Sequence, residues 1–150
     1  MNNRLKPTLG LGLAFFCLML ACQNKPEPEQ KQANQQNCYS YNTNRDTVQL
    51  SLKIQGAQVS GNLFYSIHEK DKNSGSVEGK LRGDTLLLNY TFKSEGSQSV
   101  RQVAFLKQGN SLVEGYADVQ EKGGIVMFKR PADLKFNSII VLQKSACEAN

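Results

Sequence analysis

The sequence predicts an all-β domain, in which about eight strands form an antiparallel meander that closes into an up-and-down barrel. From Thr47 onward, apolar and polar residues alternate with a period of two, as in strands with one buried face. Short turns containing glycine separate these stretches, and no helical period persists after the N-terminal segment. About eight strands are enough to close a barrel, and a two-sheet β-sandwich is the alternative.

Composition divides the 150-residue chain into four parts. Residues 1–21 are predicted to be a lipoprotein signal peptide and residues 22–37 a flexible tether, because the tether contains two prolines and no large apolar residue. Residues 38–147 are predicted to form the barrel domain, followed by a tail at residues 148–150. A domain of this length supports one hydrophobic core.

The N-terminal segment has the features of an export signal. Arg4 and Lys6 precede the largely apolar residues 9–21, which are fewer than the roughly 20 residues of a spanning helix. The segment ends in the letters MLAC, which resemble the bacterial lipobox, so Cys22 is expected to carry the lipid. In proteins that this segment resembles, Asp directly after the cysteine is the signal for retention in the inner membrane. Gln23 occupies that position here, which favours the outer membrane. A plain secretory signal with an incidental cysteine is the alternative.

Cys38 and Cys147 bracket the predicted domain and are expected to form a disulfide. Exported proteins keep such pairs oxidised, and the two ends of a compact domain often lie close together. Two distant cysteines and one histidine are too few for a metal site, so we expect no metal and no cofactor.

The first predicted hairpin turns at residues 56–57. Counting outward from this turn pairs Leu50 with Leu63 and Val48 with Tyr65, and all four side chains share one face. Because a slip of one residue would reverse every side chain, this agreement supports the register.

A second hairpin turns at residues 83–84 and joins strands at 76–82 and 85–93. It pairs Leu81 with Leu86, and Leu87 is its one apolar residue on the outer face. Together the two hairpins predict one buried cluster, which consists of Leu50, Leu52, Leu63, Leu86, Leu88, Tyr90 and Phe92.

The third predicted hairpin is centred on residues 109–110 and has apolar residues on both faces. We take the face with Ala104 as inward, because it is smaller and more apolar. The other face then carries an outer ion-pair cluster, in which Arg101 pairs with Asp118. If the hairpin faces the other way, the same residues line a polar cavity for a polar ligand. The cluster consists of Arg101, Glu114, Tyr116 and Asp118.

Two more strands are predicted at residues 125–130 and 138–144, because Pro131 and Asp133 interrupt the chain between them. They complete the count of about eight strands.

Several function classes are disfavoured. The formal net charge of +5 is dispersed along the chain, so we expect no nucleic-acid partner. His68 and Glu69 adjoin in sequence without a recognisable nucleophile, and the sequence contains no known catalytic motif, so we expect no enzyme. The segment at 71–75 begins like a calcium loop, but Ser76 and Arg82 stand where its glycine and glutamate belong.

Between Val59 and Tyr116 the chain carries an ordered set of short motifs, namely Gly61-x-Leu63-x-Tyr65, Gly83-Asp84-Thr85-Leu86, Ser94-Glu95-Gly96 and Glu114-Gly115-Tyr116. This set resembles small uncharacterised lipoproteins of the Bacteroidota. The resemblance implies export and lipid anchoring, and it implies no activity. In its strand pattern the domain is also similar to lipocalin-type barrels, which is an analogy of fold.

These observations predict a lipid-anchored lipoprotein of the bacterial cell envelope, whose barrel is a non-catalytic interaction or structural domain. Its expected partners are the membrane, through the lipid on Cys22, and an envelope protein or a glycan. The alternative is a barrel that binds a lipid or another small apolar ligand. A pocket of about 300 Å³ or more at the barrel mouth would favour the alternative.

Overall fold

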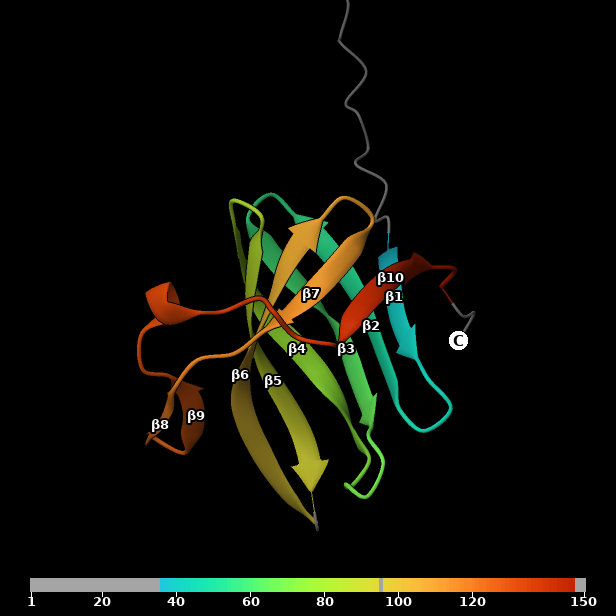
Figure 1. Ribbon diagram of the computed structural model, residues 1–150. Helices are drawn as coiled ribbons and strands as arrows, with labels where there is room; N and C mark the ends of the chain where they lie inside the picture. The colour runs from blue at the N-terminus through green and yellow to red at the C-terminus, as the bar shows by residue number, and fades with distance from the viewer. Residues whose placement is uncertain (1–35, 95, 148–150) are drawn as a thin grey trace, which may run out of the picture. The chain divides into compact units, whose positions relative to one another are not determined.

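The computed structural model describes residues 36–94 and 96–147, shown in Figure 1. Within these ranges no helix is long and apolar enough to cross a membrane. The elements in chain order are β1 (Gln36–Asn42), β2 (Thr47–Gln55), β3 (Gln58–Ser66), β4 (Asn73–Arg82), β5 (Thr85–Ser94), β6 (Ser97–Gln108), β7 (Ser111–Gly115), β8 (Val119–Lys122), β9 (Ile125–Phe128), the 3-10 helix η1 (Pro131–Asp133) and β10 (Val141–Ser145).

Eight of the strands form a closed ring. Strands β1 to β7 follow one another around the ring, and β10 lies between β7 and β1, as Figure 1 shows. Every pairing around the ring is antiparallel. The predicted up-and-down barrel is therefore confirmed, and the sandwich is excluded.

The first two predicted hairpins are confirmed in register. Leu50 pairs with Leu63 across β2 and β3, and Leu81 pairs with Leu86 across β4 and β5. Of the seven residues predicted to form one cluster, six are buried in the core and Phe92 packs against it partly exposed. The core lies in the lumen, because the inward side chains of all eight ring strands contribute to it.

The strands that close the ring differ from the prediction. β1 begins at Gln36, two residues before the predicted boundary at Cys38, and was not predicted as a strand. The predicted strand at 125–130 is β9, which forms a hairpin with β8 and pairs in parallel with β6 outside the ring. The barrel therefore has eight strands, but β1 takes the place that the prediction gave to residues 125–130.

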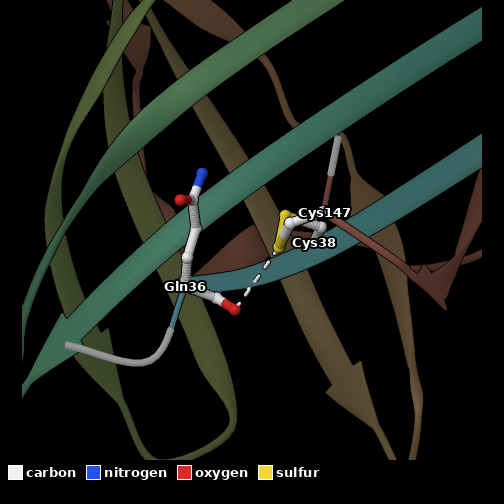
Figure 2. Close-up of a disulfide and its surroundings, with 3 residues drawn as sticks. All are labelled: Gln36, Cys38 and Cys147. Atoms are coloured by element: carbon white, nitrogen blue, oxygen red, sulfur yellow. Dashed lines mark hydrogen bonds between the residues drawn. A yellow bond between two sulfur atoms is a disulfide. The ribbon is translucent and has the colours of Figure 1, made fainter. Parts of the chain in front are cut away.

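The predicted disulfide is present. Cys38 and Cys147 are bonded, with their Cα atoms 5.2 Å apart, and Figure 2 shows the bond beside Gln36. The Cys147 Sγ lies 3.4 Å from the Gln36 carbonyl oxygen. The bond ties β1 to the residues after β10, so it joins the two ends of the described domain.

The third hairpin has the predicted register but faces the opposite way. Phe105 pairs with Glu114 as expected, yet Phe105 and Val103 belong to the core in the lumen. Ala104 and Val113 lie on the outer face and are nevertheless buried. The prediction that the Ala104 face points inward was therefore wrong.

The segment after β9 explains the apolar outer face of this hairpin. Tyr116 forms a β-bridge with Lys135, and the Glu114 N–H donates to the carbonyl oxygen of Ile140. The ring of Phe136 packs where a Cβ of Gly115 would lie. Figure 1 shows this segment running past β7 to β10. Both faces of the hairpin are covered, so both need apolar residues.

Glycines at two inward positions mark close approaches between strands. A Cβ added at Gly61 would collide with the carbonyl oxygen of Ser51, and one added at Gly79 would collide with that of Leu87. Glycine is required there because only a hydrogen fits against the neighbouring backbone.

Candidate functional site

A polar and aromatic cluster lies on the inner face of the barrel, on β3, β5 and β6 and at the end of β7. We call it the lumen cluster, and it consists of Tyr65, Tyr90, Phe92, Arg101, Glu114 and Tyr116. Arg101 pairs with Tyr90 across β5 and β6, so both side chains share the inward face of Phe105 and Leu88.

Glu114 is the buried acid of the lumen cluster, with 8% of its surface exposed. The Tyr65 hydroxyl donates to its Oε1 at 2.6 Å, and the Tyr116 hydroxyl donates to its Oε2 at 3.1 Å. The Tyr116 hydroxyl also lies 3.0 Å from the Oγ of Ser138, which accepts from the Ile140 N–H at 2.8 Å. Both oxygens of the carboxylate therefore have a hydrogen-bond donor from the protein itself.

Burial controls the protonation of this group. Burial raises the pKa of Glu114, and the hydrogen bonds from Tyr65 and Tyr116 and the charge of Arg101 oppose that rise. Burial also raises the pKa of Tyr65 and of Tyr116, and the neighbouring Glu114 adds to both increases. The two phenols therefore stay protonated at neutral pH, as their role as donors requires.

Arg101 is held by aromatic rings. Its Cζ lies 5.2 Å from the ring centroid of Tyr65, 5.5 Å from that of Tyr90 and 5.4 Å from that of Phe92. The rings of Tyr90 and Phe92 stack with centroids 4.8 Å apart. These distances lie within the range of cation–π interactions, which stabilise a partly desolvated guanidinium.

Two buried atoms of the lumen cluster have no hydrogen-bond partner among the described residues, the Tyr90 hydroxyl and the Arg101 Nε. Burial raises the pKa of Tyr90 to about 12, and Arg101 opposes the rise. The lumen cluster thus keeps some unused hydrogen-bonding capacity beside a cation.

The structure brings together three of the four residues that the sequence placed in one cluster, namely Arg101, Glu114 and Tyr116. Asp118 is exposed and forms no ion pair with Arg101. The strand β7 ends at Gly115, and Val126 of β9 is the residue that lies opposite Arg101 on that side of β6. The predicted Arg101–Asp118 ion pair was therefore wrong. The other three residues are on the inward face, as the opposite orientation of this hairpin requires; the polar cavity and its ligand stay a prediction.

Sequence reasoning missed the aromatic half of the lumen cluster. Tyr65, Tyr90 and Phe92 were assigned only to the apolar core, although the predicted registers already placed them on the inward face. Three inward aromatic residues facing an inward arginine would have signalled a cation–π site.

The remaining candidates lie in an exposed turn. The His68 Nε2 is 3.2 Å from the Glu69 Oε1, and it also contacts the Arg45 guanidinium. The Asp46 Oδ1 accepts from the His68 N–H at 2.8 Å, so the turn is fastened to the loop before β2. In the described ranges no group of three or more His, Cys, Asp or Glu residues could hold a metal ion.

A groove of about 560 Å³ lies on the outer face of β1 to β4. We call it the outer groove, and its lining consists of Gln36, Cys38, Tyr39, Ser40, Asn42, Gln49, Leu50, Ser51, Asn62, Leu63, Phe64, Ser74, Ser145 and Ala146. The polar side chains alternate with the core residues Leu50 and Leu63, so they point away from the lumen. This second site was not predicted, because it combines outward positions from several strands.

Comparison with protein-family models, with curated proteins and with solved structures finds no match to this chain.

Proposed function

We propose that this chain is a lipid-anchored protein of the bacterial outer membrane, and that its barrel is a non-catalytic module that binds a partner on its outer surface. One observation carries the proposal. A continuous core of buried side chains lies in the lumen, whereas a concave surface of about 560 Å³ lies outside the barrel, on β1 to β4. A volume of this size is within the range of ligand-binding clefts, about 300–1,000 Å³.

The lumen cluster supports a structural role for the charges inside the barrel. Glu114 accepts from two tyrosine hydroxyls, and Arg101 lies against three aromatic rings. Each charge is thus stabilised within the protein, as buried charges require. An acid whose two oxygens are already engaged is poorly placed to transfer protons to a substrate.

The proposed anchor is Cys22, which lies outside the described residues, as do the signal peptide, most of the tether and the tail. Each buried CH₂ group of an acyl chain contributes about 0.8 kcal/mol, so two or more chains on one cysteine hold a protein firmly at a bilayer. The tether would then leave the barrel free to meet a partner near the membrane surface.

A second candidate function, a barrel that binds a small ligand in its lumen, is favoured by the unpartnered Tyr90 hydroxyl and Arg101 Nε. Native mass spectrometry of the processed, lipidated protein, freed from detergent in the gas phase, separates the two functions. We expect the mass of the chain with its covalent lipid alone. An additional non-covalent mass that is lost in Arg101→Gln would contradict surface binding and support a ligand in the lumen.

A further inference from the structure

We infer that the outer groove binds a neutral oligosaccharide, such as a segment of an uncharged polysaccharide. This inference deepens the proposed function and rests on it, because it names the class of partner for the same outer surface.

The lining of the outer groove contains no side chain that is charged at neutral pH. None of its 14 lining residues is Asp, Glu, Lys or Arg, although these types make up 21% of the chain, so about three would be expected. A partner with phosphate, sulfate or carboxylate groups is normally bound by arginine or lysine. The groove therefore fits an uncharged partner.

Side chains that both donate and accept hydrogen bonds dominate the lining. It contains four carboxamides and four serine hydroxyls, namely Gln36, Asn42, Gln49, Asn62, Ser40, Ser51, Ser74 and Ser145. Carboxamides and hydroxyls each offer a donor and an acceptor. The hydroxyl groups of a sugar do the same, and they are spaced around each ring. The groove is thus chemically complementary to a chain of neutral sugars.

Two aromatic residues line the groove, and Phe64 is the one on its outer face, since Tyr39 belongs to the core. Phe64 is partly exposed on the outer face of β3, where it pairs with Gln49 on one side and Ser74 on the other. The face of an aromatic ring packs against flat apolar surfaces, such as the C–H groups on one side of a sugar ring. An aromatic platform flanked by amide and hydroxyl groups distinguishes this groove from an ordinary solvated sheet face.

A peptide partner is less compatible with the same surface. Extended peptides often bind by adding a strand to a free sheet edge, where backbone groups are unpaired. Each of β1 to β4 pairs with a neighbour on both sides, because the ring is closed. Recognition at the outer groove therefore relies on side chains rather than on backbone hydrogen bonds.

The groove is also rigid. Its floor is formed by the long antiparallel ladder of β2 and β3, and one end is tied by the disulfide between Cys38 and Cys147 (Figure 2). Ser145, which lines the groove, pairs with Cys38 across β10 and β1. A preformed site loses little conformational entropy when it binds a ligand.

The test uses the processed, lipidated protein in phosphatidylcholine vesicles, which are sedimented with fluorescein-labelled neutral polysaccharides, namely dextran, mannan, laminarin and galactan. Labelled polygalacturonate serves as the acidic probe. We expect saturable binding to at least one neutral polysaccharide, and about a tenfold weakening by Phe64→Ala, because the stacking surface is lost. The variant Leu87→Ala, which removes an outward apolar side chain from β5, should bind normally.

A second pair of variants keeps the inference testable if Phe64→Ala fails to fold. Gln49→Ala should weaken binding at an unchanged melting temperature, and Asn89→Ala, an exposed amide on β5, should have no effect. Absence of saturable binding to every neutral probe, or binding to polygalacturonate alone, would overturn the inference. So would neutral binding that Phe64→Ala and Gln49→Ala leave intact.

The failure of the inference can be distinguished from the failure of the proposed function. If a photo-crosslinker placed at Gln49 captures an envelope protein instead, the groove binds a protein, and the oligosaccharide inference alone is wrong. If polysaccharide binding is lost in Arg101→Gln and kept in Phe64→Ala, the ligand enters the lumen. Both the inference and the proposal of surface binding are then wrong.

Discussion

Glu114 shows how one side chain can depend on residues from distant parts of the chain. It lies on β7, and its donors are Tyr65 on β3 and Tyr116 just after β7. Ser138, on the segment that leads to β10, positions Tyr116 in turn. Burial penalises the charged form of Glu114, and these donors together with Arg101 reduce the penalty.

The raised pKa of Glu114 predicts a pH dependence of stability. The folded state binds the Glu114 proton more tightly than the unfolded state, whose pKa is near the ordinary 4.5. This contribution to stability is therefore fully present below pH 4.5 and is lost as the pH rises through the higher folded pKa. Glu114→Gln removes it.

Urea unfolding of the wild type and of Glu114→Gln across this pH range measures the effect. The difference in unfolding free energy, wild type minus variant, should increase as the pH falls, because the other carboxyl groups cancel in the comparison. A difference that is flat with pH, or that decreases toward acid, would contradict the raised pKa.

Two adjacent leucines on β5 test the direction of the side chains. Leu88 is fully buried in the core, whereas Leu87 lies on the outer face and is partly exposed. Leu88→Ala should lower the unfolding free energy by about 2–5 kcal/mol, and Leu87→Ala by about 1 kcal/mol or less. Equal losses in denaturant titrations would mean that the register of β4 and β5 is wrong.

At the scale of elements, β7 depends on the segment that crosses its outer face. The ring of Phe136 occupies the space where a side chain at Gly115 would lie, and Lys135 bridges to Tyr116. The crossing segment thus covers a hairpin that a barrel wall would otherwise expose to solvent. This cover explains why Ala104 and Val113 are buried although they point outward.

This packing predicts that Gly115→Ala destabilises the protein by about 1–3 kcal/mol, because the added methyl group displaces the Phe136 ring. In a Phe136→Ala background the same change should cost less than about 0.5 kcal/mol, because the obstacle is gone. A double-mutant cycle by thermal unfolding measures the coupling. Equal costs in both backgrounds would rule out the contact.

The disulfide acts at the same scale, because it ties β1 to the residues after β10. The bonded cysteines are 109 residues apart, and the chain-entropy model gives about 4.7 kcal/mol for a loop of this length. The double variant Cys38→Ser/Cys147→Ser should lose about 2–5 kcal/mol in urea titrations. In the processed, lipidated wild type only Cys38 and Cys147 could be free, so two titratable thiols in that protein, unfolded and unreduced, would show that this bond does not form.

At the scale of the whole molecule, the proposed architecture is a closed barrel held near a membrane by lipid. The closed ring leaves none of its eight strands with a free edge, and among the described strands β8, outside the ring, pairs on one side only. Closure of the ring limits edge-to-edge association. The outer groove lies on the barrel wall, so a partner could reach it without opening the fold.

Anchoring predicts that Cys22→Ser abolishes lipid attachment, because serine lacks the thiol that accepts the lipid. Membrane fractionation with metabolic labelling by a palmitate analogue should show an unlabelled protein that is soluble or unprocessed. Cys17→Ser, which alters another cysteine of the same segment, should stay labelled and membrane-bound. Normal labelling of Cys22→Ser would exclude the anchor.

Local alternation determined much of this fold from the sequence alone. Side chains point to opposite sides of a strand in turn, so the turns at residues 56–57 and 83–84 set the pairing of Leu50 with Leu63 and of Leu81 with Leu86. The disulfide followed from the positions of Cys38 and Cys147 at the ends of the domain.

Tertiary structure decided what alternation leaves open. Both faces of the third hairpin are apolar. Only the packing of Phe136 on Gly115 shows which face points out of the barrel and which points into the lumen. That choice brings Arg101 and Glu114 inside among the tyrosines. The outer groove was equally invisible, because its lining includes Gln36 and Cys38 of β1, a strand that the sequence did not predict, and Ser145 of β10. Contacts between segments far apart in the chain depend on how the whole sheet closes. An alternation of apolar and polar residues with a period of two does not specify that closure.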